Sequence, residues 1–156
     1  MKLATLLYIQ NSDGDYLLME RLRQPNIGLM SPPGGKLHTD EAESPAECAV
    51  REAYEECKLR TTAGDWKLLG IITEKDFPVI GNIMLFLFRY RKPLNVLPAP
   101  CNEGAFYFIN EKNFDEYKMP ETDRQFIWKN VLAKKDEPFN IKLDCSGYPL
   151  IKQVSD

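Results

Sequence analysis

The segment from Ser44 to Cys57 constrains the fold most strongly, because it has the pattern of a capped helix with two different faces. Ser44 is a typical capping residue, Pro45 suits the first helical position, and Glu47 has the spacing of a capping-box partner. Apolar residues then recur at helical spacing: Ala46, Ala49, Val50, Ala53 and Cys57. The helix is therefore expected to bury this face and to offer a different one to its surroundings.

The second face carries Glu52, Glu55 and Glu56, whose offsets of 0, 3 and 4 place three carboxylates side by side. Exposed like charges at this spacing repel by roughly 0.2–0.5 kcal/mol per pair. On their own, three glutamates indicate a solvated acidic face. A hard cation such as Mg²⁺ or Mn²⁺ would turn the repulsion into a binding site, because such ions prefer oxygen ligands.

A turn upstream of the helix favours a cation-binding site over a solvated acidic face. Gly34 and Gly35 permit a tight turn and a close approach of the backbone to a ligand. Lys36 adds a positive charge at the same turn, where a phosphate group would be stabilised. A carboxylate face beside a glycine turn indicates metal-dependent chemistry on a phosphorylated ligand.

This combination resembles the Nudix box, the signature of the Nudix hydrolases. The residues that carry the resemblance are Gly35, Glu43, Arg51, Glu52, Glu55, Glu56 and Leu59. Seven residues rather than five separate Gly35 from Glu43, so the loop 37–42 carries a two-residue insertion. Lys58 stands where the family has a glycine, which would end the helix with positive φ. A residue other than glycine costs roughly 1 kcal/mol in that conformation.

The resemblance implies roles for the box residues. Glu52, Glu55 and Glu56 are expected to hold the metal and to carry the catalysis, and the Gly34 carbonyl is expected to complete the metal shell. Arg51 is placed with these catalytic residues, although its main expected role is structural support. In that role it pairs with Glu43 and orients the loop, which includes Gly35, against the helix.

A further carboxylate outside the box often serves Nudix enzymes as a metal ligand or base. Glu103 is the candidate here, and a solvated loop glutamate explains it equally well. Three basic residues are candidates for contacts to phosphate groups: Arg21, Arg23 and Lys36. The alternative for the two arginines is a solvated strand end.

The segment 119–128 is similar to the base-binding segment of MutT-like hydrolases that act on oxidised purine nucleoside triphosphates. Glu121 or Asp123 would read the purine edge with its carboxylate, and Trp128 would stack on the ring. Each position also has an ordinary explanation. Asp123 suits the first turn of a helix, and Trp128 suits a core.

Length and composition narrow the class of protein. A chain of 156 residues is expected to form one domain, residues 1–156, with a real core. The net charge of −3 gives no general attraction to nucleic acid polymers or anionic membranes, and no stretch is long enough to span a bilayer. The apolar run at the N-terminus is too short for a signal peptide. The four cysteines form no C-x-x-C pair, which fits a reducing cytoplasm and argues against a zinc site. The expected partner is a small nucleotide, bound by a monomer or homodimer.

Local patterns predict strands at 3–10, 16–21, 29–31, 66–73, 82–89, 105–109 and 139–143. Asp13-Gly14 predicts a hairpin between the first two strands, and Pro25 lies in the loop that follows. A short helix is expected at 111–117 and a clearer one at 122–133, capped by Thr122 with Gln125 as its partner. This order suits the α/β fold of Nudix proteins, an α/β/α sandwich with a mixed central β-sheet.

The resemblance implies metal-dependent hydrolysis of a nucleoside triphosphate to a monophosphate and pyrophosphate, with 8-oxo-dGTP or a related purine nucleotide as the substrate. Within the same enzyme class, the alternative is an ADP-ribose or nucleotide-sugar pyrophosphatase. The alternative from another class is a non-catalytic Nudix module that binds a nucleotide or a protein. Such modules tend to lose box glutamates, and this chain has all three.

Overall fold

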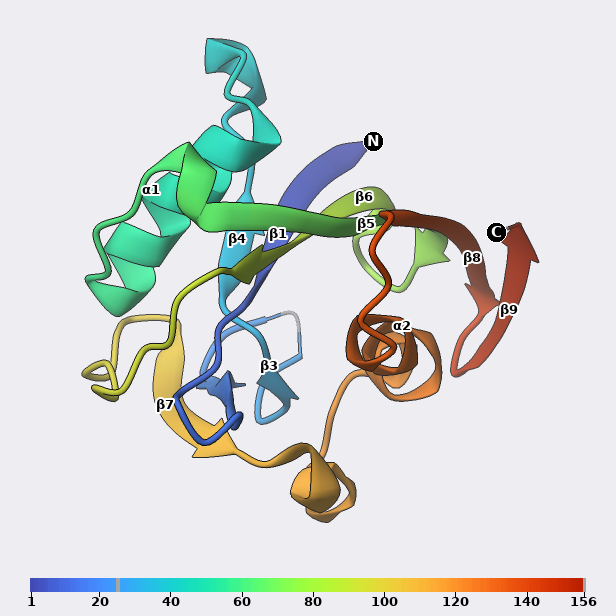
Figure 1. Ribbon diagram of the computed structural model, residues 1–156. Coiled ribbons are helices and arrows are strands. Elements are labelled where there is room, and N and C mark those ends of the chain that lie inside the picture. The colour runs from blue at the N-terminus through green and yellow to red at the C-terminus, as the bar shows by residue number, and fades with distance from the viewer. Residues whose placement is uncertain (25, 156) are drawn as a thin grey trace.

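The fold consists of two sheets with helices on both faces of the larger one (Figure 1). The structure is a computed structural model that describes residues 1–24 and 26–155. Pro25, which the sequence places in a loop, and Asp156 therefore lie outside the described residues. Within the described chain, no helix is long and apolar enough to cross a membrane.

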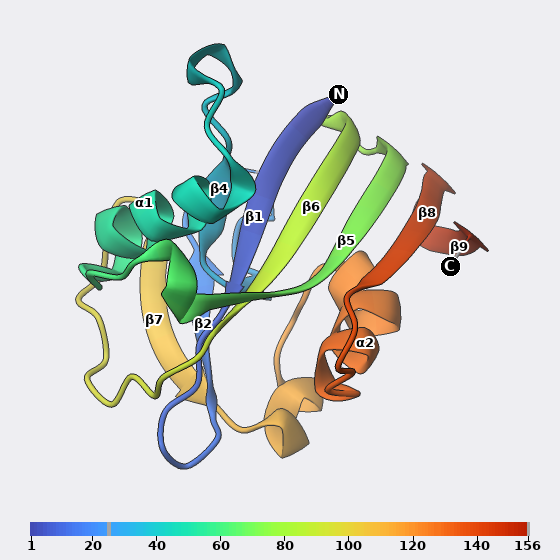
Figure 2. The same ribbon diagram turned by 45° about the horizontal axis from the view of Figure 1, so that its top comes forward.

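Six strands form the larger sheet, in the order β4-β1-β6-β5-β8-β9. Their bounds are β1 (Lys2–Tyr8), β4 (Gly34–Lys36), β5 (Trp66–Phe77), β6 (Gly81–Tyr90), β8 (Phe139–Gly147) and β9 (Leu150–Ser155). β1 runs parallel to β6 and β5 parallel to β8, whereas the other neighbours are antiparallel. Figure 2 shows β1, β6, β5 and β8 side by side. The expected mixed central sheet is confirmed.

A smaller antiparallel sheet contains β2 (Tyr16–Arg21), β3 (Met30–Ser31) and β7 (Gly104–Ile109), in the order β3-β2-β7. The expected hairpin between the first two strands is wrong. Both edges of β1 are taken by β4 and β6, so β2 meets the first strand only through the single bridge between Gln10 and Tyr16. β2 therefore belongs to the second sheet.

Helix α1 (Pro45–Cys57) covers one face of the larger sheet, where Ala49 and Ala53 join a core with Leu7 and Phe88. The helical segment made of η4 (Asp123–Ile127) and α2 (Trp128–Leu132) covers the other face. Its buried residues pack with Tyr8, Ile72 and Leu87. Three short helices complete the chain: η1 (Thr39–Glu41), η2 (Ala63–Asp65) and η3 (Glu111–Glu116). The α/β/α arrangement agrees with the sequence-based prediction.

Both ends of α1 have defined caps. The Ser44 hydroxyl accepts a hydrogen bond from the Glu47 amide at 3.1 Å, and the Glu47 carboxylate accepts one from the Ser44 amide at 3.3 Å, which confirms the capping box. At the other end Lys58 adopts the left-handed conformation, with φ of 55°. The amides of Lys58 and Leu59 bond to the carbonyls of Tyr54 and Ala53, so this lysine ends the helix as the family glycine would.

The second helical segment differs from the prediction. Thr122 has helical dihedral angles and makes no capping hydrogen bond, so it lies inside the helix. Gln125 instead donates to the Glu121 carboxylate at 3.0 Å. Residues Asp123–Ile127 form a π-helical turn, a feature that is rare and is found often at functional sites.

The C-terminal hairpin was only partly foreseen. The strand predicted at 139–143 continues to Gly147, and β9 returns antiparallel to it. The strand β9 gives a weak signal, because Leu150 and Val154 are exposed and only Ile151 is buried among its apolar residues. β4 was also missed, since its sequence is Gly-Gly-Lys.

We predict that Lys58→Gly stabilises the protein by about 0.5–1 kcal/mol, because glycine adopts positive φ without the steric cost of a Cβ atom. Urea-induced unfolding followed by circular dichroism measures the difference. Lys58→Ala is the matched control, since it removes the same lysine contacts but keeps the Cβ atom. An equal gain in both variants would show that the backbone conformation is not the cause.

Candidate functional site

Glu56 occupies the centre of the candidate site. Its carboxylate is buried, with 6% of the residue exposed, and it accepts a hydrogen bond from the Gly34 amide at 2.8 Å. Burial, followed by the nearby charge of Glu52, raises the pKa of Glu56 to about 8. The Gly34 amide that donates to Glu56 is neutral, and a cation would stabilise the buried carboxylate more strongly. Glu56 is therefore suited to bind a metal ion.

Glu52 lies against Gly35, which belongs to the short strand β4 rather than to the tight turn that the sequence predicts. A Cβ atom on Gly35 would overlap the Glu52 carboxylate, so the absence of a side chain at this position makes room for the acid. Burial raises the pKa of Glu52, although a 2.8 Å hydrogen bond from Arg51 opposes this effect. A Cβ atom on Gly34 would overlap the Thr5 carbonyl, so β4 also needs glycine there to pair with β1.

Arg51 connects the acids to the loop. Its guanidinium binds Glu43 through two hydrogen bonds, of 2.7 and 3.0 Å, and also donates to Glu52 and to Glu55. A further bond of 2.9 Å reaches the Lys36 carbonyl. The pair with Arg51 lowers the pKa of Glu43 to about 2. The ion pair that the motif implies is present, and Arg51 also joins α1 to β4, the strand that contains both glycines.

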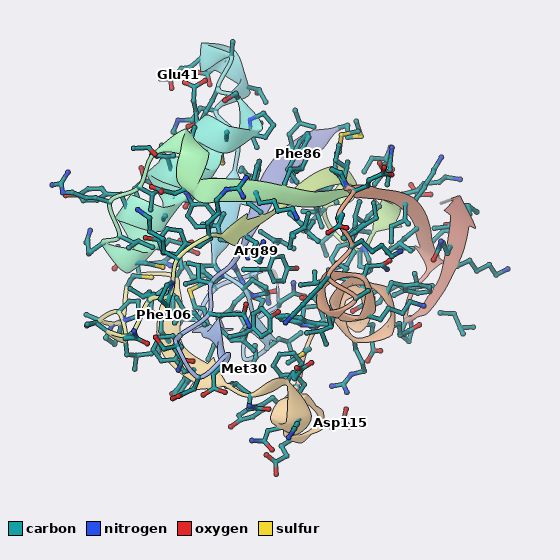
Figure 3. All side chains as sticks on the ribbon, viewed as in Figure 1. Met30, Glu41, Phe86, Arg89, Phe106 and Asp115 are labelled. Atoms are coloured by element: carbon teal, nitrogen blue, oxygen red, sulfur yellow. The ribbon has the colours of Figure 1, made fainter. Side chains whose placement is uncertain are left out.

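The two-residue insertion does not disturb this pair. Its residues form the η1 turn, with Ala42 in the left-handed conformation. The His38 amide donates to the Glu43 carboxylate at 2.9 Å, and the Glu43 amide donates to the His38 carbonyl at 3.2 Å. In Figure 3, Glu41 lies at the tip of this loop, away from the body of the molecule. The insertion thus projects outward and returns Glu43 to Arg51.

Glu103 and Arg21 border the site from the smaller sheet. Their side chains lie 3.7 Å apart, and the Leu22 amide donates to the Glu103 carbonyl. The charge of Glu103 raises the pKa of Glu56 and that of Arg21 lowers it, so both groups lie within electrostatic range of the central acid. Sequence reasoning therefore identified a glutamate that the fold brings to the box.

The other basic candidates are less engaged. Arg23 is exposed and donates to the Asn102 carbonyl at 3.0 Å, on the same turn as Glu103. Lys36 is exposed at the end of β4 and contributes its carbonyl, rather than its ammonium group, to the contacts of Arg51. Gly34 likewise presents its amide to Glu56, and its carbonyl remains a prediction as a metal ligand.

The donor set fits a divalent metal. Carboxylate oxygens of Glu52, Glu55 and Glu56 are the ligands that Mg²⁺ and Mn²⁺ prefer, and burial raises the pKa of the Glu56 carboxyl group. Arg51 bridges Glu52 and Glu55 in this arrangement. Among residues 1–24 and 26–155, no three carboxylate, imidazole or thiol groups lie in a geometry that would hold a metal ion without rearrangement.

A second pair of acids lies beneath η4, on the opposite face of the sheet. Glu74 of β5 is 4% exposed and Asp123 is 5% exposed. Burial raises the pKa of Glu74 to about 8, with the charge of Asp123 as the second cause, and burial raises the pKa of Asp123 to about 7. In the described part of the chain, three buried polar atoms near this pair have no hydrogen-bond partner: Glu74 Oε2, Tyr8 Oη and Trp128 Nε1. This cluster has unmet capacity for hydrogen bonds.

Of this pair, sequence reasoning singled out Asp123 and missed Glu74. The available signal was a charged residue two positions after Ile72, where strand alternation places it on the same buried face. The segment before Asp123 is also in place, since Glu121 is half-buried and bonds to Gln125.

Trp128 does not offer a ring face to a base. It is 5% exposed, and its indole packs against Tyr8, Tyr16 and Phe114 with centroids 4.6–5.1 Å apart. The expectation that it stacks on substrate is therefore corrected: Trp128 is a core residue, because three aromatic rings already surround it.

We predict that the free energy of unfolding falls as pH rises from about 4 to about 8. The reason is that Glu74 and Asp123 bind protons more tightly in the folded state than in the unfolded state. Glu74→Gln removes one of these groups, so its stability relative to wild type should increase with pH across this range. Thermal unfolding at pH 5, 6.5 and 8 measures the trend. Glu116→Gln, at an exposed position of η3, is the control and should run parallel to wild type, and a parallel Glu74→Gln curve would contradict the assignment.

Comparison with known proteins identifies the family. A NUDIX domain profile matches residues 1–130. The mutator MutT protein from Bacillus halodurans superposes with a TM-score of 0.76 at 23% identity, over 99% of this chain and 95% of that chain. The NUDIX domain of Shewanella oneidensis NrtR, complexed with ADP ribose, gives 0.70 at 13% identity over 85% and 86%. The Escherichia coli dihydroneopterin triphosphate pyrophosphohydrolase gives 0.65 at 17% identity over 84% and 95%. The solved structures show the same fold, and with the profile match they establish that the chain belongs to the Nudix family of pyrophosphohydrolases.

Proposed function

We propose that this protein, as a single domain, hydrolyses a purine nucleoside triphosphate to the monophosphate and pyrophosphate with Mg²⁺ or Mn²⁺, and that oxidised purines such as 8-oxo-dGTP are among its substrates. The observation that carries the proposal is the buried Glu56 carboxylate, held by the Gly34 amide beside Glu52 and within range of Glu103. These acids lie against the two glycines of β4, where the absence of a side chain on Gly35 accommodates the Glu52 carboxylate.

The chemistry follows from this arrangement. A divalent metal supplies charge neutralisation, a more acidic bound water and alignment for an in-line displacement. Glu52, Glu55 and Glu56 would hold it, and Glu103, whose charge acts on Glu56, is the residue that we propose as an additional ligand or proton acceptor. Arg21 adds a cation beside the same acids, where a phosphate group needs one. Arg51 and Glu43 act as positioning residues.

The second buried acid pair supports a purine base. Ala4, Leu85 and Ile72 form a row across β1, β6 and β5, beginning beside Lys36 of β4, and Glu74 lies two residues beyond this row. Three strand spacings of about 4.8 Å give a separation of about 14 Å, which an extended nucleotide covers. Because this pair lies on the face opposite α1, the proposed nucleotide would pass around the edge strand β4, with its phosphates near Gly34 and Gly35 and its base toward Glu74 and Asp123.

The raised pKa values of this pair indicate its hydrogen-bonding pattern. Two carboxyl groups that interact in a buried setting resist double ionisation, so the pair offers one proton donor alongside acceptors. A guanine-like edge carries an N–H donor next to a carbonyl acceptor and complements this pattern. The similarity to the dihydroneopterin triphosphate pyrophosphohydrolase supports the same reading, because a pterin has a comparable edge.

An alternative substrate class is ADP-ribose or a nucleotide sugar. The similarity to the NrtR NUDIX domain complexed with ADP ribose favours it. Adenine presents a different edge, an amino donor beside a ring nitrogen acceptor. The preference for a guanine-like base over adenine therefore depends on the Glu74–Asp123 pair. Rates of hydrolysis of the two nucleotides measure this preference.

The test is a nucleotide panel incubated with Mg²⁺ or Mn²⁺, with products identified by mass spectrometry. We expect purine triphosphates to yield monophosphate and pyrophosphate. A result dominated by ADP-ribose would overturn the triphosphate preference. Binding of nucleotides without hydrolysis of any panel member would instead support a non-catalytic module.

Glu55→Gln should lower kcat by at least about 100-fold, the upper range for residues that merely support metal ligands. Glu41→Gln is the matched control and should leave the rate unchanged.

A separate prediction concerns the glycine turn. Gly35→Ala should leave the fold intact but lower kcat by about a hundredfold, because the new methyl group displaces the Glu52 carboxylate, and small displacements of reacting groups have effects of this size. Circular dichroism checks the fold and steady-state kinetics measure the loss. Gly64→Ala, in the η2 turn where a Cβ atom meets only ordinary contacts, is the control. Full activity in Gly35→Ala would show that Glu52 is not needed in its present position.

A further inference from the structure

A cavity of about 240 Å³ lies on the sheet face covered by α2, away from α1 and its glutamates. Its polar lining comes from the segment after β1, from β2, β5 and β6, and from the segment after α2: Gln10, Tyr16, Lys67, Arg89, Lys134, Lys135 and Asp136. In Figure 3, Arg89 lies toward the middle of the molecule as viewed. Four cations and one carboxylate therefore share a cavity that the proposed hydrolysis does not use.

The placement of two of these cations is unfavourable in the absence of an anion. Lys67 and Arg89 are direct cross-strand partners in the antiparallel pair of β5 and β6. Like charges at such positions destabilise a sheet, because the Cβ atoms are only about 4.5–5.5 Å apart. Across the described chain, the ion pairs and hydrogen bonds leave both side chains without a partner.

The end of α2 adds two more positive charges. Lys134 adopts a left-handed conformation with φ of 50°, which is unusual for a residue with a Cβ atom. The C-terminal end of a helix favours cations, which accounts for Lys134 and Lys135. It does not account for Lys67 and Arg89, which lie on strands.

Tyr16 provides a polar group inside the cavity. The residue is 3% exposed, it lines the cavity, and within the described residues its hydroxyl makes no hydrogen bond. Burial and the charge of Glu111 raise the pKa of Tyr16, and the charge of Arg89, which lines the same cavity, opposes this shift. Arg89 and Tyr16 thus place a fixed charge and a free O–H donor together, with Asp136 and Glu111 as the opposing charges.

We propose that this cavity binds a phosphate-type oxyanion, either inorganic phosphate or pyrophosphate, at Lys67, Arg89 and the Tyr16 hydroxyl. A tetrahedral oxyanion accepts bonds from a guanidinium fork, an ammonium group and a hydroxyl, and it neutralises the repulsion between the cross-strand cations. The volume of about 240 Å³ is several times the roughly 30 Å³ that one water molecule occupies, so either anion fits with some of its hydration. The site is separate from the box glutamates and does not depend on the proposed hydrolysis.

Calorimetric titration of the metal-free protein with sodium phosphate and with sodium pyrophosphate, at low ionic strength in EDTA, tests the proposal. We expect millimolar or tighter binding that weakens with added salt. Arg89→Gln and Lys67→Gln should each weaken it at least tenfold, whereas Asp136→Asn should tighten it. The stronger of the two titrants identifies which oxyanion the cavity prefers.

Two controls keep the outcome interpretable. Lys142→Gln, exposed on the face of β8 that α2 does not cover, should bind like wild type. Arg89→Gln should unfold at the same temperature as wild type or higher, because it relieves a like-charge pair. No detectable binding by wild type would overturn the proposal. Binding that survives Arg89→Gln but is lost in Arg21→Gln would overturn it as well, since the anion would then occupy the box.

Discussion

The fork of hydrogen bonds from Arg51 is the interaction on which the rest of the site depends. One guanidinium holds Glu43 from the loop, Glu52 and Glu55 from its own helix, and a carbonyl of β4. Only a planar group with several fixed donors makes these contacts at once, so a lysine would not replace it. Through them the edge strand, the inserted loop and α1 keep one relative position. The hydrogen bonds of Arg51 therefore hold Gly34 and Gly35 of β4 against the glutamates of α1.

Arg51 also divides the acids into two kinds. Glu43 is fully compensated, which its lowered pKa reflects, and Glu52 and Glu55 are partly compensated by the same cation. Glu56 has a single amide donor and a raised pKa. Negative charge is thus balanced more fully where α1 meets the loop, at Glu43, than where α1 meets β4, at Glu56. Under the proposed function, a metal would bind at this second place, and this division follows from the direction of one side chain.

Sequence patterns predicted what depends on local spacing. The capping box, the helix stripe and the acid face of α1 follow from residues within a few positions of one another. The strand partners were harder, because the Asp13-Gly14 turn predicts a hairpin, while competition for the edges of β1 decides where β2 goes. Trp128 shows a related limit, since helical spacing alone does not distinguish a stacking ring from a core ring. Glu74 was missed because its partner Asp123 is 49 positions away in the chain.

The buried acids beneath η4 extend this argument to the second face of the sheet. A buried polar atom left without a partner costs about 1–3 kcal/mol, and Glu74, Tyr8 and Trp128 each contribute one such atom. Packing alone would favour apolar residues here, as it does at Ile72 on the same strand. A ligand that supplies the missing donors and acceptors would recover part of this energy on binding. The π-helical turn that directs Asp123 inward therefore belongs with Glu74 to one buried polar cluster rather than forming a separate irregularity of the fold, and this cluster is the base site that we propose.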